Sequence, residues 1–271
     1  TMQIGRNSSD PGYIAWRDGR SMQYLNGFSI SGVYRPLHIE ASQDGSRTLM
    51  IVGSPNAFLF NNDTGEVLRK IGSGSTRVEG TFSPNGNYVV VYNGFGIVHL
   101  LDAEQGETIF VDEPHGYFHA DTSVLNAVFS PDSTLLAVAK GNKTLLWDVA
   151  TGATVQTFAH QARTLKMHFS PDGTLLAVAT DAATVHLWDI KQAKEIAVLQ
   201  HSDVIDWMQF HPNGAQLATL SNQQVRFWST ADGRERSVLD VPLIVPTKLG
   251  YTEDGERFFT VSQDGTLRIW D

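Results

Sequence analysis

The segment Val111–Asp121 holds the densest group of residues that could do chemistry. Two histidines, three carboxylates and two aromatic residues lie close together there: Asp112, Glu113, His115, Tyr117, Phe118, His119 and Asp121. Imidazole and carboxylate groups can bind metal ions, but His-x-x-x-His is diagnostic only on a helix, and Pro114 argues against one. We therefore expect an extended surface loop without a metal. Aromatic residues in a long loop are typical contact residues, so Tyr117 and Phe118 are candidates for partner binding.

Motifs for covalent chemistry are missing from the sequence. Neither the GxSxG turn of acyl-transfer enzymes nor the GxxxxGK[ST] phosphate loop occurs. The Asp and Glu residues lie mostly in turns, where they favour turn geometry. There is no cysteine, which excludes disulfides, thiol chemistry and cysteine-bound zinc. We expect no enzyme activity and no cofactor.

Composition indicates an ordinary globular protein. The chain has 271 residues, 41% hydrophobic and 18% charged, and a formal net charge of −9. The negative charge and the absence of clustered Lys and Arg make nucleic acid and anionic lipid poor partners. No apolar stretch reaches the ~18 residues of a membrane helix, and the N-terminus lacks a signal-peptide layout. We expect a soluble, cytoplasmic protein; Thr1 before Met2 leaves a tag remnant, a removed targeting segment or a longer parent protein as alternatives.

The elements that position these residues follow an internal period. Seven turn signals of the Asp-Gly or Asn-Gly type have their second residues at Gly19, Gly45, Gly86, Ser133, Gly173, Gly214 and Gly255. The successive spacings are 26, 41, 47, 40, 41 and 41 residues. A fixed period of this size is the signature of a repeat architecture.

Each repeat has the chemistry of two β-hairpins. The turn signals tolerate positive φ, and β-forming runs such as Met167–Phe169 and Leu175–Val178 flank them. A second short break leads to a strand that ends in Trp, and a third break leads to a strand such as Thr154–Phe158. Each repeat is thus predicted to be four antiparallel strands in about 40 residues. A lone sheet of this kind is marginal in water, so neighbouring copies must bury its faces.

The strand endings LeuLeuTrpAsp (145–148), HisLeuTrpAsp (186–189) and ArgIleTrpAsp (268–271), with the period and the FSPDG turn, resemble the WD-repeat β-propeller family. The resemblance covers residues 37–271 and implies an all-β fold of four-stranded antiparallel blades. We predict one propeller domain over residues 1–271, with seven blades, or six if residues 1–35 act as a clasp and cover. The last repeat stops after its third strand, so we expect Met2–Gly5 to close the ring as the outer strand of that blade.

The resemblance also implies a structural cluster of a loop His, a Ser or Thr, an Asp and the Trp in each blade. The matching residues are His160, Thr180 and Trp188; His201, Ser221 and Trp228; and Ser262, Asp264 and Trp270. Ala182 and Gln223 occupy two of the Asp places. His119 falls at the place of the loop His, which is a further reason to expect no metal site there.

A propeller enzyme would need acids or histidines that converge on the central channel. Glu40, His168 and Gln209 could face such a channel. His99 and His186 share one place on the third strand, where Arg268 stands in the last repeat, so we expect a solvated or inter-blade polar position. A channel-sited enzyme, or a binder of a metal or small ligand, is the alternative to a binding scaffold. A structural subunit or domain of a larger protein is another.

The favoured function is a non-catalytic scaffold that binds a protein or peptide through one face of the propeller. The first strands of successive repeats place His38, Glu79, Asn126, Lys166, Trp207 and Lys248 at one position. The resemblance implies that these side chains ring the mouth of the channel. Trp207, the only apolar member, is either packed between blades or exposed as a binding anchor.

Overall fold

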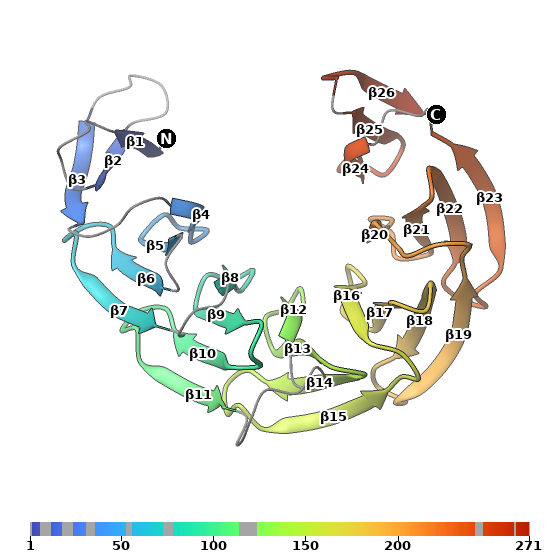
Figure 1. Cartoon of the computed structure of the whole chain (residues 1–271), viewed down its shortest axis with the longest axis horizontal. Helices are drawn as coiled ribbons and strands as arrows, with labels where there is room; N and C mark the ends of the chain where they lie inside the picture. The colour runs from blue at the N-terminus through green and yellow to red at the C-terminus, as the bar shows by residue number, and fades with distance from the viewer. Residues whose placement is uncertain are drawn as a thin grey trace. The chain divides into compact units, whose positions relative to one another are not determined.

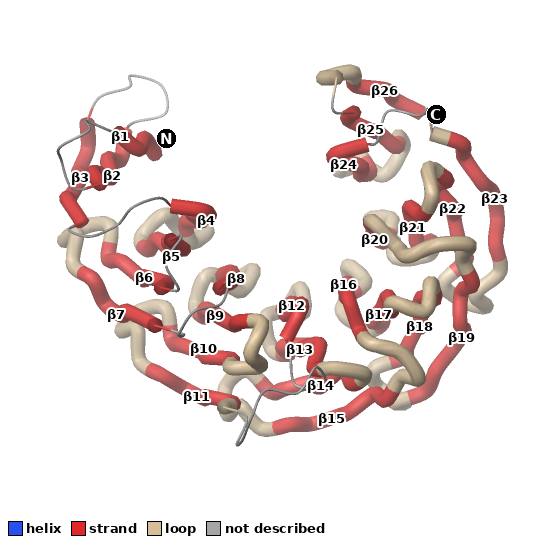
Figure 2. The backbone as a smooth tube through the Cα atoms, viewed as in Figure 1, coloured by secondary structure: helices blue, strands red, loops and turns tan. Residues whose placement is uncertain are grey.

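The computed structural model describes residues 2–5, 12–17, 24–30, 36–52, 56–72, 78–113, 124–241, 246–262 and 264–270; before residue 37, at 124–125 and at 246–248 it describes the backbone alone. These residues form antiparallel strands and no helix (Figures 1 and 2). The fold is therefore all-β, as the sequence predicts. None of the described segments is a helix with the length and hydrophobicity needed to cross a bilayer.

The strands pair in sequence order into five sheets of four strands and two sheets of three. The first sheet holds β1 (Met2–Gly5), β2 (Gly12–Arg17) and β3 (Tyr24–Ile30). The next two hold β4 (Pro36–Ala41), β5 (Arg47–Val52), β6 (Asn56–Asn61) and β7 (Val67–Gly72), then β8 (Val78–Phe82), β9 (Tyr88–Asn93), β10 (Val98–Asp102) and β11 (Thr108–Asp112).

Two four-stranded sheets come from the repeats quoted above. They hold β12 (Val124–Phe129), β13 (Leu135–Lys140), β14 (Lys143–Asp148) and β15 (Thr154–Ala159), then β16 (Thr164–Phe169), β17 (Leu175–Thr180), β18 (Thr184–Asp189) and β19 (Lys194–Gln200). The last two sheets hold β20 (Trp207–Phe210), β21 (Gln216–Ser221), β22 (Gln224–Ser229) and β23 (Glu235–Asp240), then β24 (Pro246–Tyr251), β25 (Phe258–Ser262) and β26 (Leu267–Trp270). The four-stranded repeat predicted from the sequence is confirmed.

In the four-stranded sheets, burial falls from the second strand to the fourth. In β17 every residue after Leu175 is buried, whereas in β23 every residue except Leu239 is exposed. A strand that is buried on both faces must have covers on both sides of its sheet. Within each unit, neighbouring sheets therefore pack face to face, and the fourth strands form solvent-exposed edges.

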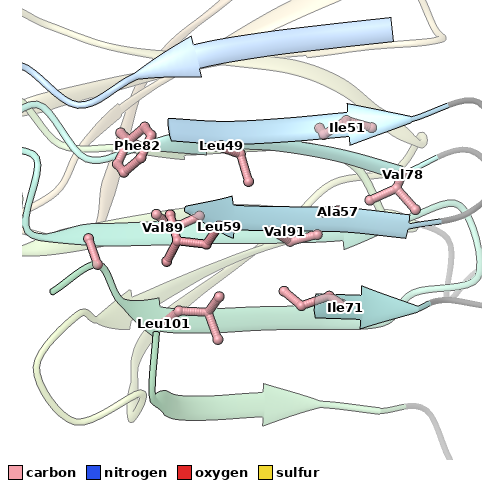
Figure 3. Close-up of a cluster of buried hydrophobic side chains, with 11 residues drawn as sticks. Leu49, Ile51, Ala57, Leu59, Ile71, Val78, Phe82, Val89, Val91 and Leu101 are labelled. Carbon is pink, nitrogen blue, oxygen red and sulfur yellow. The ribbon is translucent and has the colours of Figure 1, made fainter. Parts of the chain in front are cut away.

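The contacts divide the chain into two compact units. Residues 1–124 and 148–153 form the first unit, and residues 125–147 and 154–271 form the second. In the first unit, Leu49, Leu59 and Ile71 of one sheet pack with Val89 and Leu101 of the next (Figure 3). The single domain predicted from the sequence stays a prediction.

The Asp-Gly turns are built by one recurring set of side-chain bonds. Ser170 donates to Asp172 at 2.6 Å, and Asp172 accepts from the backbone N–H of Thr174 at 3.1 Å. The Leu175 N–H returns a bond to the Ser170 hydroxyl at 2.9 Å. The donated hydrogen bond lowers the pKa of the Asp172 carboxyl, so the carboxylate form holds the turn at neutral pH.

The strand expected to close the ring is in another sheet. Met2–Gly5 pairs with Gly12–Arg17, with Met2 opposite Trp16, and the last sheet has the order β24, β25, β26. The predicted pairing of Met2–Gly5 with the last repeat is therefore not confirmed. A local hairpin closes a shorter loop than a pairing of distant segments, and so costs less chain entropy.

Glycine in the turn between the third and fourth strands lets neighbouring sheets approach. Gly233 has φ +68°, and a Cβ built on it would lie 2.1 Å from the Cβ of Ala197 in the preceding sheet. Gly152, with φ +69°, also lies close to another side chain, since its Cβ would be 2.4 Å from the Phe110 Cβ. Any side chain at these places would push the sheets apart.

We predict that Gly233→Ala destabilises the protein by ~3 kcal/mol, because a left-handed backbone strain adds to the overlap with Ala197. Gly214→Ala is the matched control: its φ is +74°, but no atom lies within 4 Å of the built Cβ. The control should cost only ~1 kcal/mol. Urea denaturation of both variants measures the difference, and equal losses would contradict the close-packing argument.

Candidate partner-binding site

A cavity between two sheets of the first unit brings together residues from the first strands. Its volume is about 500 Å³, within the range of ligand pockets. The lining residues are Leu37, His38, Ile51, Val78, Glu79, Gly80, Thr81 and Tyr92. His38 and Glu79, predicted from the sequence to share one ring, therefore lie at one site.

The cavity has an apolar wall and an acidic rim. Leu37 is 64% exposed at its entrance, although it is a large aliphatic residue. The Tyr92 hydroxyl donates to Glu79 Oε2 at 3.1 Å, which fixes one carboxylate. Beside the cavity, Thr81 donates to Glu40 Oε1 at 3.0 Å, and His38 Nε2 lies 3.5 Å from the other oxygen of Glu40. Two oriented carboxylates next to an apolar surface suit a cationic side chain with an aliphatic stem.

Two other predicted contact residues instead join neighbouring sheets of the second unit. Lys166 Nζ donates to the backbone carbonyls of Ile205, at 3.1 Å, and of Asp206. Burial lowers the Lys166 pKa, and the Asp206 carboxylate partly offsets this. Asn126 Oδ1 accepts the Met167 N–H at 3.0 Å. Both side chains form hydrogen bonds with backbone groups of the neighbouring sheet region, which the sequence alone did not reveal.

We considered two positions for Trp207, packed between sheets or exposed as a binding anchor. The structure shows the packed position. Trp207 is half-buried against the cluster of Leu220, Leu249 and Phe258, and its ring lies edge-on to Phe258 at 6.0 Å between centroids. Such aromatic pairs stabilise the contact between sheets. A partner-binding role for this residue stays a prediction.

Three predicted contact residues cannot be compared with the cavity. Tyr117 and Phe118 lie outside the described residues, as do His115, His119 and Asp121. Lys248 is in β24, opposite Val261, but its side chain is not described. Among the residues that the structure describes, no group of three His, Asp or Glu is arranged to hold a metal ion.

The structural cluster is present in the β20–β23 sheet, with one different member. His201 Nδ1 donates to the Leu199 carbonyl at 3.2 Å, and its Nε2 accepts from the Thr219 hydroxyl at 2.8 Å. Trp228 Nε1 donates to the same hydroxyl at 2.8 Å. The hydroxyl that joins His and Trp is therefore Thr219 and not the predicted Ser221.

The strand register explains this correction. Thr219 lies opposite Arg226 and Ser221 opposite Gln224, so only Thr219 is near enough to the ring of Trp228. Ser221 donates instead to the Asp203 carbonyl at 2.7 Å. The last sheet repeats the pattern: Trp270 Nε1 donates to Thr260 at 3.3 Å, while Ser262 accepts from Arg268. Asp264 accepts from the Thr266 N–H within its own turn.

The β16–β19 sheet has no hydroxyl group at the position where Thr219 joins His201 and Trp228. Val178 lies opposite His186 at the place that Thr219 takes in the next sheet. Trp188 Nε1 is buried and has no hydrogen-bond partner among the described residues, although its ring contacts Phe158. His160 still lies edge-on to Trp188, but its Nε2 bonds to Thr144 at 3.1 Å. Thr180, predicted to join the cluster, bonds to Thr184 at 2.7 Å.

Some of the residues that we considered for catalysis have polar partners. His186 Nδ1 lies 2.5 Å from Glu195, and its Nε2 lies 3.2 Å from Thr184, both within its own sheet. Burial lowers the pKa of His99 and of His168, and the His168 ring packs near Phe210. Gln209 lies beside Gly250.

Comparisons with known proteins agree with this architecture. The family model of the anaphase-promoting complex subunit 4 WD40 domain matches residues 127–213, and that of the WD domain, G-beta repeat, matches residues 245–271. The chain belongs to the WD-repeat family.

Three relatives show how far the likeness extends. Small ribosomal subunit protein RACK1 of Drosophila melanogaster is 27% identical over 31% of this chain and 29% of its own length. WD repeat-containing protein 1 of Bos taurus is 28% identical over 53% of this chain and 23% of its own length. The guanine nucleotide-binding protein subunit beta of Oryza sativa subsp. indica is 26% identical over 55% of this chain and 44% of its own length. The aligned part is thus less than half of each of these relatives.

Removing the hydroxyl at position 219 should lower the free energy of unfolding, whereas adding one at the equivalent position 178 should raise it. Thr219→Val leaves Trp228 Nε1 without its acceptor and should cost ~2 kcal/mol. Val178→Thr gives Trp188 Nε1 an acceptor at the equivalent place and should stabilise by ~1 kcal/mol. Urea denaturation tests the pair, and a loss of stability in both variants would refute the assigned role of this position.

The buried histidines should make stability depend on pH. Burial is the main reason that the pKa of His160 and that of His201 fall to about 4. The nearby His186 also lowers the His160 pKa. Arg226 also lowers the His201 pKa, whereas Glu235 raises it. The unfolded value is about 6.5, so between the two values the unfolded chain binds more protons. The contribution of these two neutral histidines to the free energy of unfolding is complete above pH ~6.5. It is lost as the pH falls toward about 4.

We therefore expect the melting temperature to fall between pH 7 and 4.5. A His160→Asn/His201→Asn variant should melt lower at pH 7.5 but show a shallower decline, with a residual slope from His99 and His168. Calorimetry across this range provides the measurement. An unchanged slope in the double variant would mean that other groups cause the dependence.

Proposed function

We propose that the protein is a non-catalytic scaffold that binds a protein or peptide partner, with the Leu37–Glu79 cavity as a contact site. The observation that carries the proposal is an exposed leucine in a cavity of about 500 Å³, with the oriented carboxylate of Glu79 in its lining and that of Glu40 beside it. The partner segment that fits is basic, with an aliphatic stem against Leu37 and a cation near Glu79. The net charge of −9 favours such a partner over nucleic acid.

The names of relatives support a role in an assembly. The anaphase-promoting complex domain, the small ribosomal subunit protein and the guanine nucleotide-binding protein all carry the word subunit in their names. For this chain, membership of a larger assembly is part of the proposal. We also propose that the seven sheets are seven blades of one propeller, because each needs neighbours to cover its faces.

Variants at the cavity test the proposal. The chain serves as bait, and quantitative mass spectrometry compares the proteins retained by the wild type, Leu37→Asp and Glu79→Lys. Val155→Asp is the matched control, because Val155 is a 54% exposed aliphatic residue outside the cavity. We expect a partner that both cavity variants retain at least ~10-fold less, a typical effect of a contact residue, and that the control retains fully. Equal retention by all folded variants would refute the cavity as the contact site.

A further inference from the structure

One residue of the Leu37–Glu79 cavity is of the type that gains or loses a charge between pH 5 and 8, which is histidine. Among the described residues that line the cavity, His38 is the only histidine. Half of its side chain is exposed, so the imidazole ring can take up a proton without any change in the packing of the sheets. The other titratable residues of the lining are Glu79 and Tyr92, and neither of these residue types has its ordinary pKa in this range.

The carboxylate of Glu40 is oriented towards this ring. Glu40 Oε1 accepts from the Thr81 hydroxyl at 3.0 Å, and the other oxygen, Oε2, lies 3.5 Å from His38 Nε2. His38 and Glu40 are two residues apart on β4, so their side chains leave the strand on the same face. A protonated imidazole therefore forms an ion pair with Glu40 at the edge of the cavity.

The charge of His38 also acts on the place where we propose that a partner cation binds. When the imidazole is neutral, Glu79 and Glu40 supply two negative charges; when it is protonated, its positive charge offsets one of them. A cavity of about 500 Å³ is about 10 Å across, so a cation bound in it lies within roughly one Debye length of the ring. Like charges at this separation repel each other, and the repulsion opposes binding.

We propose that protonation of His38 weakens the binding of a cationic partner side chain in this cavity, which makes the cavity a pH-sensitive contact. This proposal rests on the function proposed above and adds a means of regulation to it. An imidazole is mostly neutral at about pH 7.5 and mostly protonated at about pH 5.5. The affinity for the partner is therefore highest at the upper pH and falls as the pH falls.

Two blocked tripeptides test this coupling. One is acetyl-Ala-Lys-Ala-amide, and the other has norleucine in place of lysine, which keeps the aliphatic stem and removes the charge. NMR titration of the full chain at about pH 7.5 and pH 5.5, followed at the Leu37 methyl groups, gives the dissociation constants. We expect the lysine probe to bind about threefold more weakly at the lower pH, as one screened like-charge repulsion would give. The norleucine probe should bind equally at both pH values.

Three variants assign the effect to one residue. His38→Gln keeps a polar side chain that does not titrate, so it should bind the lysine probe at both pH values as the wild type does at the upper one. His38→Lys carries a permanent charge, so it should bind the probe at both pH values as weakly as the wild type does at the lower one. His211→Gln removes a histidine outside the cavity and should keep the pH dependence. Circular dichroism checks that each chain is folded at both pH values.

The possible results separate this proposal from the function on which it rests. A pH dependence that persists in His38→Gln would assign the effect to another group and overturn the proposal. Equal binding by the wild type at both pH values, with weaker binding in Leu37→Asp, would also overturn it but would leave the contact site in place. No saturable binding at ~10 mM lysine probe, or binding that Leu37→Asp and Glu79→Lys leave unchanged, would refute the contact site and the pH effect together.

Discussion

The faces of each four-stranded sheet must be covered by neighbouring sheets, and the rest of the structure depends on this constraint. Second strands such as Leu175–Thr180 are buried on both faces, which no isolated sheet could achieve. A turn of one sheet can lie directly on a strand of the neighbouring sheet only if the residue at the contact is glycine, as at Gly152 and Gly233. A polar group that the contact removes from water also costs free energy unless another group forms a hydrogen bond with it.

Successive sheets meet the polar requirement in different ways. In the β20–β23 sheet one threonine hydroxyl serves both His201 and Trp228. With Val178 at the equivalent place, His160 bonds to Thr144 of the preceding sheet instead. The histidines remain neutral in both cases because burial lowers their pKa. A shared period therefore does not imply a shared hydrogen-bond network.

The need for hydrogen bonds between sheets also decides which first-strand side chains are available to a partner. Lys166 and Asn126 are used to hold neighbouring backbone segments, whereas Glu79 and His38 line a cavity beside the exposed Leu37. The contact site that we propose lies where the packing between sheets is incomplete. The cavity at Leu37 combines apolar surface with the oriented carboxylate of Glu79.

The sequence by itself determined the repeat, the strands and the turns, because these depend on local chemistry. Ser170, Asp172 and Gly173 specify their turn within a few residues, and the β-forming apolar residues on both sides specify the flanking strands. The sequence also placed His38 and Glu79 at matching positions. Only the tertiary structure selected Thr219 over Ser221, bonded Lys166 to Ile205 and packed Trp207 against Phe258. Those contacts join residues far apart in the chain, and the register and approach of whole sheets decide them.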